Sequence, residues 1–330
     1  MTTIKSARDL AAPGFRDKFG EVVDLRGGSE FQILRTVDLV NRLNPRGMPF
    51  GWTVNPYRGC EVGCVYCYAR STHEYLGQRD PRAFDRVIYV KDADPRRLRR
   101  RLRAAGASGL EVAIGTATDP YQPGEARFGV TRAVLRALGE VGGVRVGITT
   151  KSARIARDIE LLRSVADSCD LVVNVSLISL DAELLRRLEP RAPRPDLRLE
   201  AVSTLTRAGI RTRIFIMPVL PFITDGEAGL RALVSAARSA GAGEVVSNTL
   251  FLRGAARSFF LGWIARELPW LRGRYADLYG TSDYAPPAYR QLIEQLVDRI
   301  AREQGLPGRT REERIRQEAP ARPRQLSLVW

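Results

Sequence analysis

Three cysteines lie close together in one short stretch of the chain, and their spacing is suited to metal chemistry. Cys60, Cys64 and Cys67 form the pattern C-x3-C-x2-C within NPYRGCEVGCVYCYAR, after a predicted strand and before a helix that we expect to begin near Val65. Three thiolates on three irons of a 4Fe-4S cube leave the fourth iron open to a ligand from outside the protein. The amino and carboxylate groups of S-adenosylmethionine (SAM) are able to chelate that iron.

Zinc is the alternative that this cysteine pattern leaves open. His73, the only histidine, follows Cys67 by six residues and would complete a Cys3His set of ligands. Zinc modules of this kind are usually small and self-contained, whereas these cysteines precede a long α/β array. We therefore favour the cluster and expect His73 to pack or hydrogen-bond nearby. Cys169 stands alone and is expected to be a small buried apolar side chain.

The elements that position these cysteines follow an α/β pattern. Short β-branched runs alternate with segments rich in Arg, Leu and Ala, and several runs are almost continuously apolar, as buried parallel strands are. Asp94 and Pro95 predict the start of a helix over RRLRRRLRAAG, in which Leu98 and Leu102 share a buried face. This alternation favours a barrel or an open parallel sheet and leaves the choice between them open. The predicted strands are 52–57, 86–91, 110–117, 144–150, 171–177, 212–219 and 245–252.

Several longer segments resemble one known family. They are MPFGWTVNPYRGCEVGCVYCYARSTHEYLG, GTATDPYQPGEARFGVTR, ITTKSARIARDIELL and NVSLISLDAELLRRLEPRAPRPDLRLEAV. Together with C-x3-C-x2-C and the aromatic residue before its last cysteine, they make residues 46–225 resemble the radical SAM superfamily, in its spore photoproduct lyase-like branch, often called DNA repair photolyases.

This resemblance implies both a fold and a reaction. The fold is a partial TIM-like (β/α)6 barrel with its site at the carboxyl ends of the strands. Cys60, Cys64 and Cys67 would hold a 4Fe-4S cluster, as the matching cysteines do in that family. The enzyme, of lyase or transferase type, would use the reduced cluster to cleave SAM to methionine and a 5′-deoxyadenosyl radical, which takes hydrogen from the substrate.

The resemblance also assigns roles to three residues near the cysteines. Tyr66 and Tyr68 match the tyrosines that flank the last cluster ligand in spore photoproduct lyase, where they would assist radical transfer or line the cluster. Thr116 stands where the lyase has its hydrogen-donor cysteine. Because a hydroxyl is a far poorer hydrogen-atom donor than a thiol, we expect this enzyme not to be a true spore photoproduct lyase.

Five further residues are candidate SAM contacts. Lys151 ends the strand VGITT, where a cation is able to meet the SAM carboxylate, and a solvated lysine at a strand end is the alternative. Asn174 and Ser176 alternate along VVNVSL, so both side chains lie on one face of the strand. Thr118 and Asp119 follow another predicted strand, and the alternative for Asp119 is the capping of a turn.

We predict four regions along the chain. Residues 1–45 form an N-terminal arm, 46–255 the barrel, 256–305 a helical cap, and 306–330 a flexible, disordered basic tail. In the cap, RSFFLGWIARELPWL and YRQLIEQLVDRIAREQG are predicted to be two helices.

The last residues of the tail, QLSLVW, resemble the short peptide by which bacterial repair proteins bind the sliding clamp. Gln325, Leu326, Leu328 and Trp330 would fill an apolar groove, with the tail as a tether. The alternative is an apolar end that packs on its own domain.

The charge of the chain favours a phosphate-rich partner. Lys and Arg number 52 against 37 Asp and Glu, a net charge of +15, and only four of these cations are lysines. Arginine binds phosphate through a planar fork of donors, so DNA is a predicted partner. The candidate contacts are Arg96–Arg103 and the arginines around Pro190–Pro195. An arginine-rich genome and a solvated helix face are the alternatives.

Three functions therefore remain open. The first is a radical SAM enzyme that repairs or modifies DNA, and the second is one that modifies a protein, peptide or small molecule. The third is a non-catalytic, metal-bearing protein that binds nucleic acid. Either enzyme would need an electron donor such as flavodoxin or ferredoxin. The lone histidine argues against a Ser/His/Asp triad. With neither a signal-peptide pattern nor a membrane-length apolar run, we expect a cytoplasmic protein without a membrane partner.

Overall fold

The main sheet of the protein is largely parallel. The structure, a computed structural model, describes residues 19–26, 28–35, 38–43, 50–78, 80–92 and 94–307. Seven strands follow the order β11-β10-β9-β8-β7-β4-β3. Neighbours from β4 to β11 are parallel, and β3 runs antiparallel to β4. The strands are β3 (Val40–Arg42), β4 (Phe50–Val54), β7 (Glu111–Ile114), β8 (Arg145–Thr150), β9 (Asp170–Ser176), β10 (Thr212–Val219) and β11 (Glu244–Thr249).

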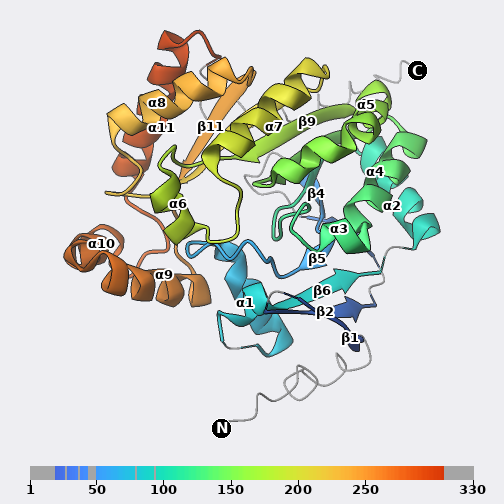
Figure 1. Ribbon diagram of the computed structural model, residues 1–330, viewed down its shortest axis with the longest axis horizontal. Coiled ribbons are helices and arrows are strands. Elements are labelled where there is room, and N and C mark those ends of the chain that lie inside the picture. Colours follow the sequence, from blue (N-terminus) through green and yellow to red (C-terminus); the bar gives the residue numbers. More distant parts are fainter. Residues whose placement is uncertain are drawn as a thin grey trace, which may run out of the picture.

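The six parallel strands form the predicted partial (β/α)6 barrel. They are adjacent in space in the same order as in the sequence, because the intervening helices return the chain to the next position in the sheet. Helices surround the outer side of this sheet (Figure 1). They are α2 (Pro95–Ala107), α4 (Val130–Val141), α5 (Ile159–Ser168), α7 (Pro195–Arg207), α8 (Glu227–Ser239) and α11 (Pro287–Glu303). All carboxyl ends of the parallel strands therefore meet at one edge.

Burial on both faces accounts for the apolar runs that predict these strands. In β9 every residue after Asp170 is buried. Ile148 of β8 lies opposite Val173 of β9, and both are fully buried. A parallel sheet covered on both faces needs such residues at nearly every position.

Helix α2 begins where its sequence predicts. The side chain of Asp94 accepts hydrogen bonds from the backbone N–H groups of Arg96 and Arg97, which have no partner inside the helix. Pro95 occupies the first turn, where no amide hydrogen is needed. Leu98 and Leu102 are buried against the barrel, as predicted.

A second sheet corrects the picture of the N-terminal part. It has the order β1-β2-β6-β5, and the predicted arm contributes two of these strands as well as β3. The strand predicted over 86–91 exists, but it pairs with β2 rather than with the barrel. The strands are β1 (Phe19–Arg26), β2 (Ser29–Leu34), β5 (Tyr57–Arg58) and β6 (Val87–Lys91). The pairing of β2 with β6 joins segments far apart in the sequence, which local patterns cannot indicate.

The helix expected near Val65 begins later and is of another type. Residues Tyr68–Leu76 form a 3-10 helix, η3. The backbone N–H of Val65 donates instead to the carbonyl of Leu188, 2.9 Å away, and Cys67 is still extended. The last cysteine therefore lies at the end of a loop and not inside a helix.

The helices beyond the barrel are more numerous than expected. The two predicted ones are present as α9 (Gly254–Glu267) and α11, and the short α10 (Arg272–Tyr279) lies between them. Helix α9 packs against η3, while α11 packs against β11 and α8. Residues 308–330, which make up all but the first two residues of the predicted tail and include Gln325, Leu326, Leu328 and Trp330, lie outside the described residues. Within the described ranges, no helix has the length and apolar character needed to span a membrane.

Candidate active site

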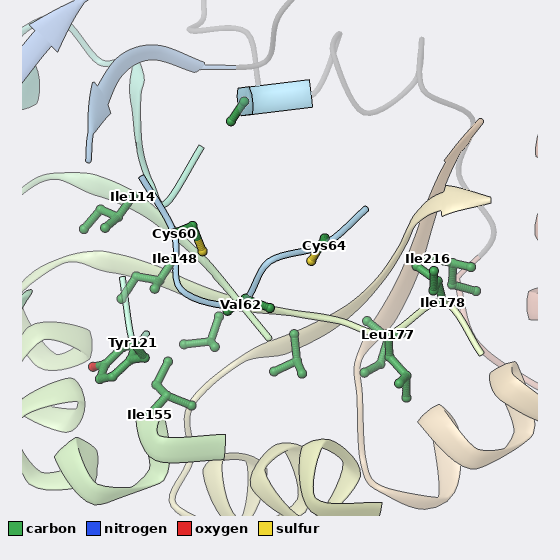
Figure 2. Close-up of a cluster of buried hydrophobic side chains, with 14 of the residues drawn as sticks. Cys60, Val62, Cys64, Ile114, Tyr121, Ile148, Ile155, Leu177, Ile178 and Ile216 are labelled. Carbon is green, nitrogen blue, oxygen red and sulfur yellow. The ribbon is translucent and has the colours of Figure 1, made fainter. Parts of the chain in front are cut away.

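The three cysteines lie on a loop between β5 and η3, beside the carboxyl ends of the barrel strands. Cys60 and Cys64 are buried and Cys67 is half-buried. Figure 2 shows Cys60 and Cys64 on this cysteine loop with apolar side chains around them. The backbone N–H of Cys60 donates to the carbonyl of Phe84 at 2.9 Å. Gly59 has a φ of +89°, and a Cβ there would lie 2.7 Å from the carbonyl oxygen of Val87, so the turn into the loop requires glycine.

Arg70 holds the shape of the cysteine loop. Its guanidinium is buried and donates to the carbonyl of Cys64 from Nε at 3.1 Å and from Nη2 at 3.0 Å, and to the carbonyl of Gly63 at 3.1 Å. The same group forms an ion pair with Asp85 at 2.6 Å. The ring of Phe259 from α9 covers it, with 4.0 Å from Cζ to the ring centroid. The hydrogen bonds and the ion pair of Arg70 therefore fix the conformation of the loop. Sequence reasoning missed Arg70, because nothing local distinguishes it from the other arginines.

The residues present fit a 4Fe-4S cluster. The backbone N–H of Asp119 donates to Sγ of Cys60 at 3.4 Å, a bond that favours thiolate. Burial raises the pKa of all three thiols, that of Cys64 to about 12, so a positive metal centre is needed to hold them as thiolates. Among the described residues, no three His, Cys, Asp or Glu side chains converge as ligands of one ion. Ligands of a cube each bind a different iron, so their sulfurs do not have to converge in that way.

His73 is engaged away from the cysteines. Its Nε2 lies 3.1 Å from the carbonyl oxygen of Val87, and its ring packs against Phe84 and Tyr89. Burial lowers the pKa of His73 to about 4, so the ring is neutral. This packing is the predicted structural role and offers no support for a Cys3His zinc site. Cys169 is also buried elsewhere, with its Sγ 3.6 Å from the carbonyl oxygen of Leu138.

Lys151 and Ser176, two of the predicted SAM contacts, meet at the ends of β8 and β9. Nζ of Lys151 donates to Oγ of Ser176 at 3.0 Å and lies 4.0 Å from Oε1 of Glu189. The hydroxyl of Tyr66 donates to the same carboxylate oxygen, and Nζ lies 5.8 Å from the centroid of the Tyr66 ring. The other oxygen of Glu189 pairs with the buried Arg198. We call these five residues, Tyr66, Lys151, Ser176, Glu189 and Arg198, the buried ionic network.

The charges in this network support one another. Burial alone would raise the pKa of Glu189, but Arg198 and Lys151 outweigh it and lower that pKa. Burial would likewise lower the pKa of Lys151, but the interactions of its ammonium with Cys64, in the thiolate form, and with the carboxylate of Glu189 raise it overall. Lys151 is therefore charged, and an ammonium has three N–H donors, so it retains the capacity to bind a further acceptor. Glu189 and Arg198 were missed by sequence reasoning.

Asp119 joins two loops of the barrel. Its Oδ1 accepts from the hydroxyl of Thr150 at 2.6 Å and from the backbone of Tyr121 at 2.9 Å, and Oδ2 accepts from the backbone of Lys151 at 2.8 Å. The bond to Tyr121 is the turn-capping contact that the sequence offers as an alternative. Thr118 ties the same loop to the cysteines, since its hydroxyl donates to the carbonyl of Gly59 at 2.6 Å. SAM contact by either residue stays a prediction.

Asn174 lies on β9 with one acceptor unused. Its Nδ2 donates to Oγ1 of Thr149 at 3.4 Å, while its buried Oδ1 has no hydrogen-bond partner in the part of the chain that the structure describes. Buried polar atoms are rarely left unpaired. Asn174 is therefore suited to accept a hydrogen bond from a bound ligand.

Tyr68 and Thr116 also lie together. The hydroxyl of Tyr68 donates to the backbone carbonyl of Thr116, and its ring packs on Phe251 with centroids 5.1 Å apart. The Oγ1 of Thr116 accepts from Nδ2 of Asn55 at 3.0 Å. Tyr68 is 44% exposed, whereas Tyr66 is buried, so the two tyrosines that flank Cys67 differ in their access to solvent.

Comparison with known proteins agrees with this geometry. The family model of the radical SAM superfamily matches residues 54–233. An uncharacterized protein of Mycobacterium tuberculosis is 36% identical over 294 residues, which cover 88% of this chain and 86% of that protein. An uncharacterized protein of Methanocaldococcus jannaschii is 26% identical over 200 residues, which cover 60% of this chain and 72% of that protein.

Among solved structures, spore photoproduct lyase complexed with dinucleoside spore photoproduct has a TM-score of 0.59, with 12% identity over 82% of this chain and 78% of the lyase. A mutant of that lyase with bound AdoMet and dinucleoside spore photoproduct has the same TM-score and identity, over 82% of this chain and 79% of the mutant. At such identity the likeness is one of fold. Because the family model spans more than half of the chain and includes the whole cysteine loop, the chain belongs to the radical SAM superfamily and is an enzyme of that class, with a fold similar to that of spore photoproduct lyase.

Proposed function

We propose that this enzyme binds a 4Fe-4S cluster through Cys60, Cys64 and Cys67, cleaves SAM reductively, and acts on DNA. The observation that carries the first part is the preformed cysteine loop, held by Arg70 beside the strand ends. The cluster, when bound, supplies one electron for cleavage of the SAM sulfonium. The protein itself supplies binding, orientation and a site closed to water.

The buried ionic network is suited to the polar part of SAM. Lys151 would bind the carboxylate of SAM, because its charged ammonium is fixed between Ser176 and Glu189 and retains donor capacity. The unpartnered Oδ1 of Asn174 would accept a hydrogen bond from an amino or hydroxyl group.

Thr116 sets this enzyme apart from spore photoproduct lyase in the proposal. Its hydroxyl is bound to Asn55 and offers no weak S–H bond for hydrogen transfer. Repair that ends with hydrogen return from a cysteine at this position is therefore not proposed. We propose instead that the substrate radical leads to a modification of the DNA and does not take back a hydrogen atom from a cysteine.

Charge and fold support DNA as substrate. The net charge is +15, and the solved structures with this fold include a lyase in complex with a dinucleoside spore photoproduct. The predicted arginine groups are partly engaged within the protein, however. Arg99 pairs with Glu140, and Arg187 pairs with Glu267.

These internal pairs favour a second candidate function, the modification of a protein, peptide or small molecule. One experiment separates the two. After anaerobic reconstitution, DNA affinity is measured across a range of salt concentrations, because a protein that contacts phosphates loses affinity as salt rises. Binding that falls steeply with salt would support DNA, and absent or salt-independent binding would favour the second candidate.

Replacement of Lys151 by alanine is expected to weaken SAM binding without loss of iron. A hydrogen bond from a charged donor is worth roughly ten- to one-hundredfold in affinity. Iron content and SAM affinity of the anaerobically reconstituted protein are the measurements. Lys91→Ala is the matched control, since it removes the same charge from β6 of the second sheet. Unchanged SAM affinity in Lys151→Ala would rule out this assignment.

A further inference from the structure

A pocket next to the cysteine loop has no role in the proposed chemistry. Its volume is about 240 Å³, and its lining comes from four separate parts of the chain. Phe31 comes from β2, Arg127 and Phe128 from the short helix α3 (Glu125–Phe128), and Arg154 from the segment after β8. Glu61, the neighbour of Cys60, also lines it. The pocket therefore lies at the same edge of the barrel as the cysteines.

The apolar part of this pocket includes two aromatic rings, the buried Phe31 and the half-buried Phe128. Phe31 and Phe128 have centroids 5.2 Å apart and ring planes at 41°. Gly124 keeps the space beside them, because a Cβ there would lie 2.6 Å from Cε1 of Phe31. A flat aromatic ligand can pack against such a ring, either stacked on it or with an edge against its face.

The rim of the pocket is cationic. Arg127 and Arg154 are both exposed, and the guanidinium of Arg127 lies 5.2 Å from the centroid of the Phe128 ring. The carboxylate of Glu61 is directed to the protein, since its Oε2 accepts from the backbone N–H of Gly124 at 2.6 Å. Two arginines beside an aromatic surface are suited to an anion attached to a flat ring.

We propose that this pocket binds one unpaired nucleotide of a DNA strand, next to the nucleotide on which the enzyme acts. The base would pack against the half-buried ring of Phe128, which the buried Phe31 supports from behind, and its phosphate would meet Arg127 and Arg154. The pocket has room for a single base and not for a duplex, in which the faces of each base are covered by its neighbours. This inference rests on the proposed action on DNA and adds to it the form of the substrate, a strand with an unpaired base.

The test is a binding assay with the reconstituted holoenzyme. A fluorescein-labelled single-stranded oligodeoxynucleotide, the duplex of the same sequence, and an unlabelled deoxynucleoside monophosphate as competitor are the probes. The wild type is expected to bind the single strand more tightly than the duplex. Phe128→Ala should weaken single-strand binding roughly five- to one-hundredfold, the usual effect of losing a base-stacking ring. Arg154→Ala should weaken it and lower the slope of log affinity against log salt by about 0.7.

The control is Arg302→Ala, which removes the same charge at the end of α11, a helix packed against β11 and α8. It should bind like the wild type. If the monophosphate competes for the wild type but not for Phe128→Ala, this would also support the pocket. It would further identify a free nucleotide as a sufficient ligand. If the wild type, Phe128→Ala and Arg154→Ala all bind each DNA probe with the same affinity, the proposed role of the pocket would be overturned, although the protein would still bind DNA. A wild type that cleaves SAM under dithionite but binds no DNA would instead overturn the proposed substrate.

Discussion

Replacement of Cys64 by serine is expected to remove most of the iron from the protein and to abolish reductive cleavage of SAM. Serine has nearly the shape of cysteine, but its hydroxyl is a far weaker iron ligand than the thiolates that hold such clusters. A cube held by two cysteines would be lost on purification. The measurements are iron and sulfide per chain, about four of each in the wild type, and methionine released under dithionite.

Cys169→Ser is the matched control for this prediction. It makes the same chemical change at another buried cysteine, whose Sγ lies 3.6 Å from the carbonyl oxygen of Leu138 and not in the cysteine loop. It should keep its iron. Full iron in Cys64→Ser, or equal loss in both variants, would contradict the assignment of the ligands.

Cys64→Ser should remain folded, which makes its loss of iron interpretable. The carbonyls of Gly63 and Cys64 are held by the guanidinium of Arg70, and these bonds do not involve the thiol. The circular dichroism spectrum of the variant should therefore match that of the wild type.

The barrel was predictable because its signals are local. A strand buried on both faces needs a continuous apolar run, and the strands predicted over 144–150 and 171–177 correspond to β8 and β9. Spacing alone indicated the three cysteines, and alternation along β9 put Asn174 and Ser176 on one face. These predictions depend on residues within one element or one loop.

The residues that were missed act across long separations in the sequence. The hydroxyl of Tyr66 meets the carboxylate of Glu189, 123 positions later. Arg198 belongs to a segment whose arginines suggested phosphate contact, yet its side chain is buried in the ionic network. No local pattern distinguishes a buried arginine with a carboxylate partner from an exposed one. The pairing of β2 with β6 was missed for the same reason.

Glu189→Ala is expected to lower the free energy of unfolding by about 3–5 kcal/mol, the usual cost of leaving a buried charge without its partner. The side chain of Arg198 is 1% exposed, and Glu189 is the carboxylate with which it forms an ion pair. The hydrogen bonds from Arg198 to the carbonyls of Ser176 and Pro193 remain, but they do not neutralise its charge. Urea unfolding followed by circular dichroism, with both proteins in the same state of reconstitution, measures the difference.

Two comparisons test whether the unpaired charge is the cause. Glu267→Gln removes one partner of the exposed pair with Arg187, 3.1 Å apart, and should cost less than about 1 kcal/mol, because water replaces the lost partner. The double variant Glu189→Leu with Arg198→Met removes both buried charges and should recover much of the stability lost in Glu189→Ala. If the double variant is no more stable than Glu189→Ala, the loss comes from packing. If it is stable but binds SAM poorly, the ionic network serves mainly to hold Lys151 in place, since the ammonium would then lack the carboxylate that lies 4.0 Å from it.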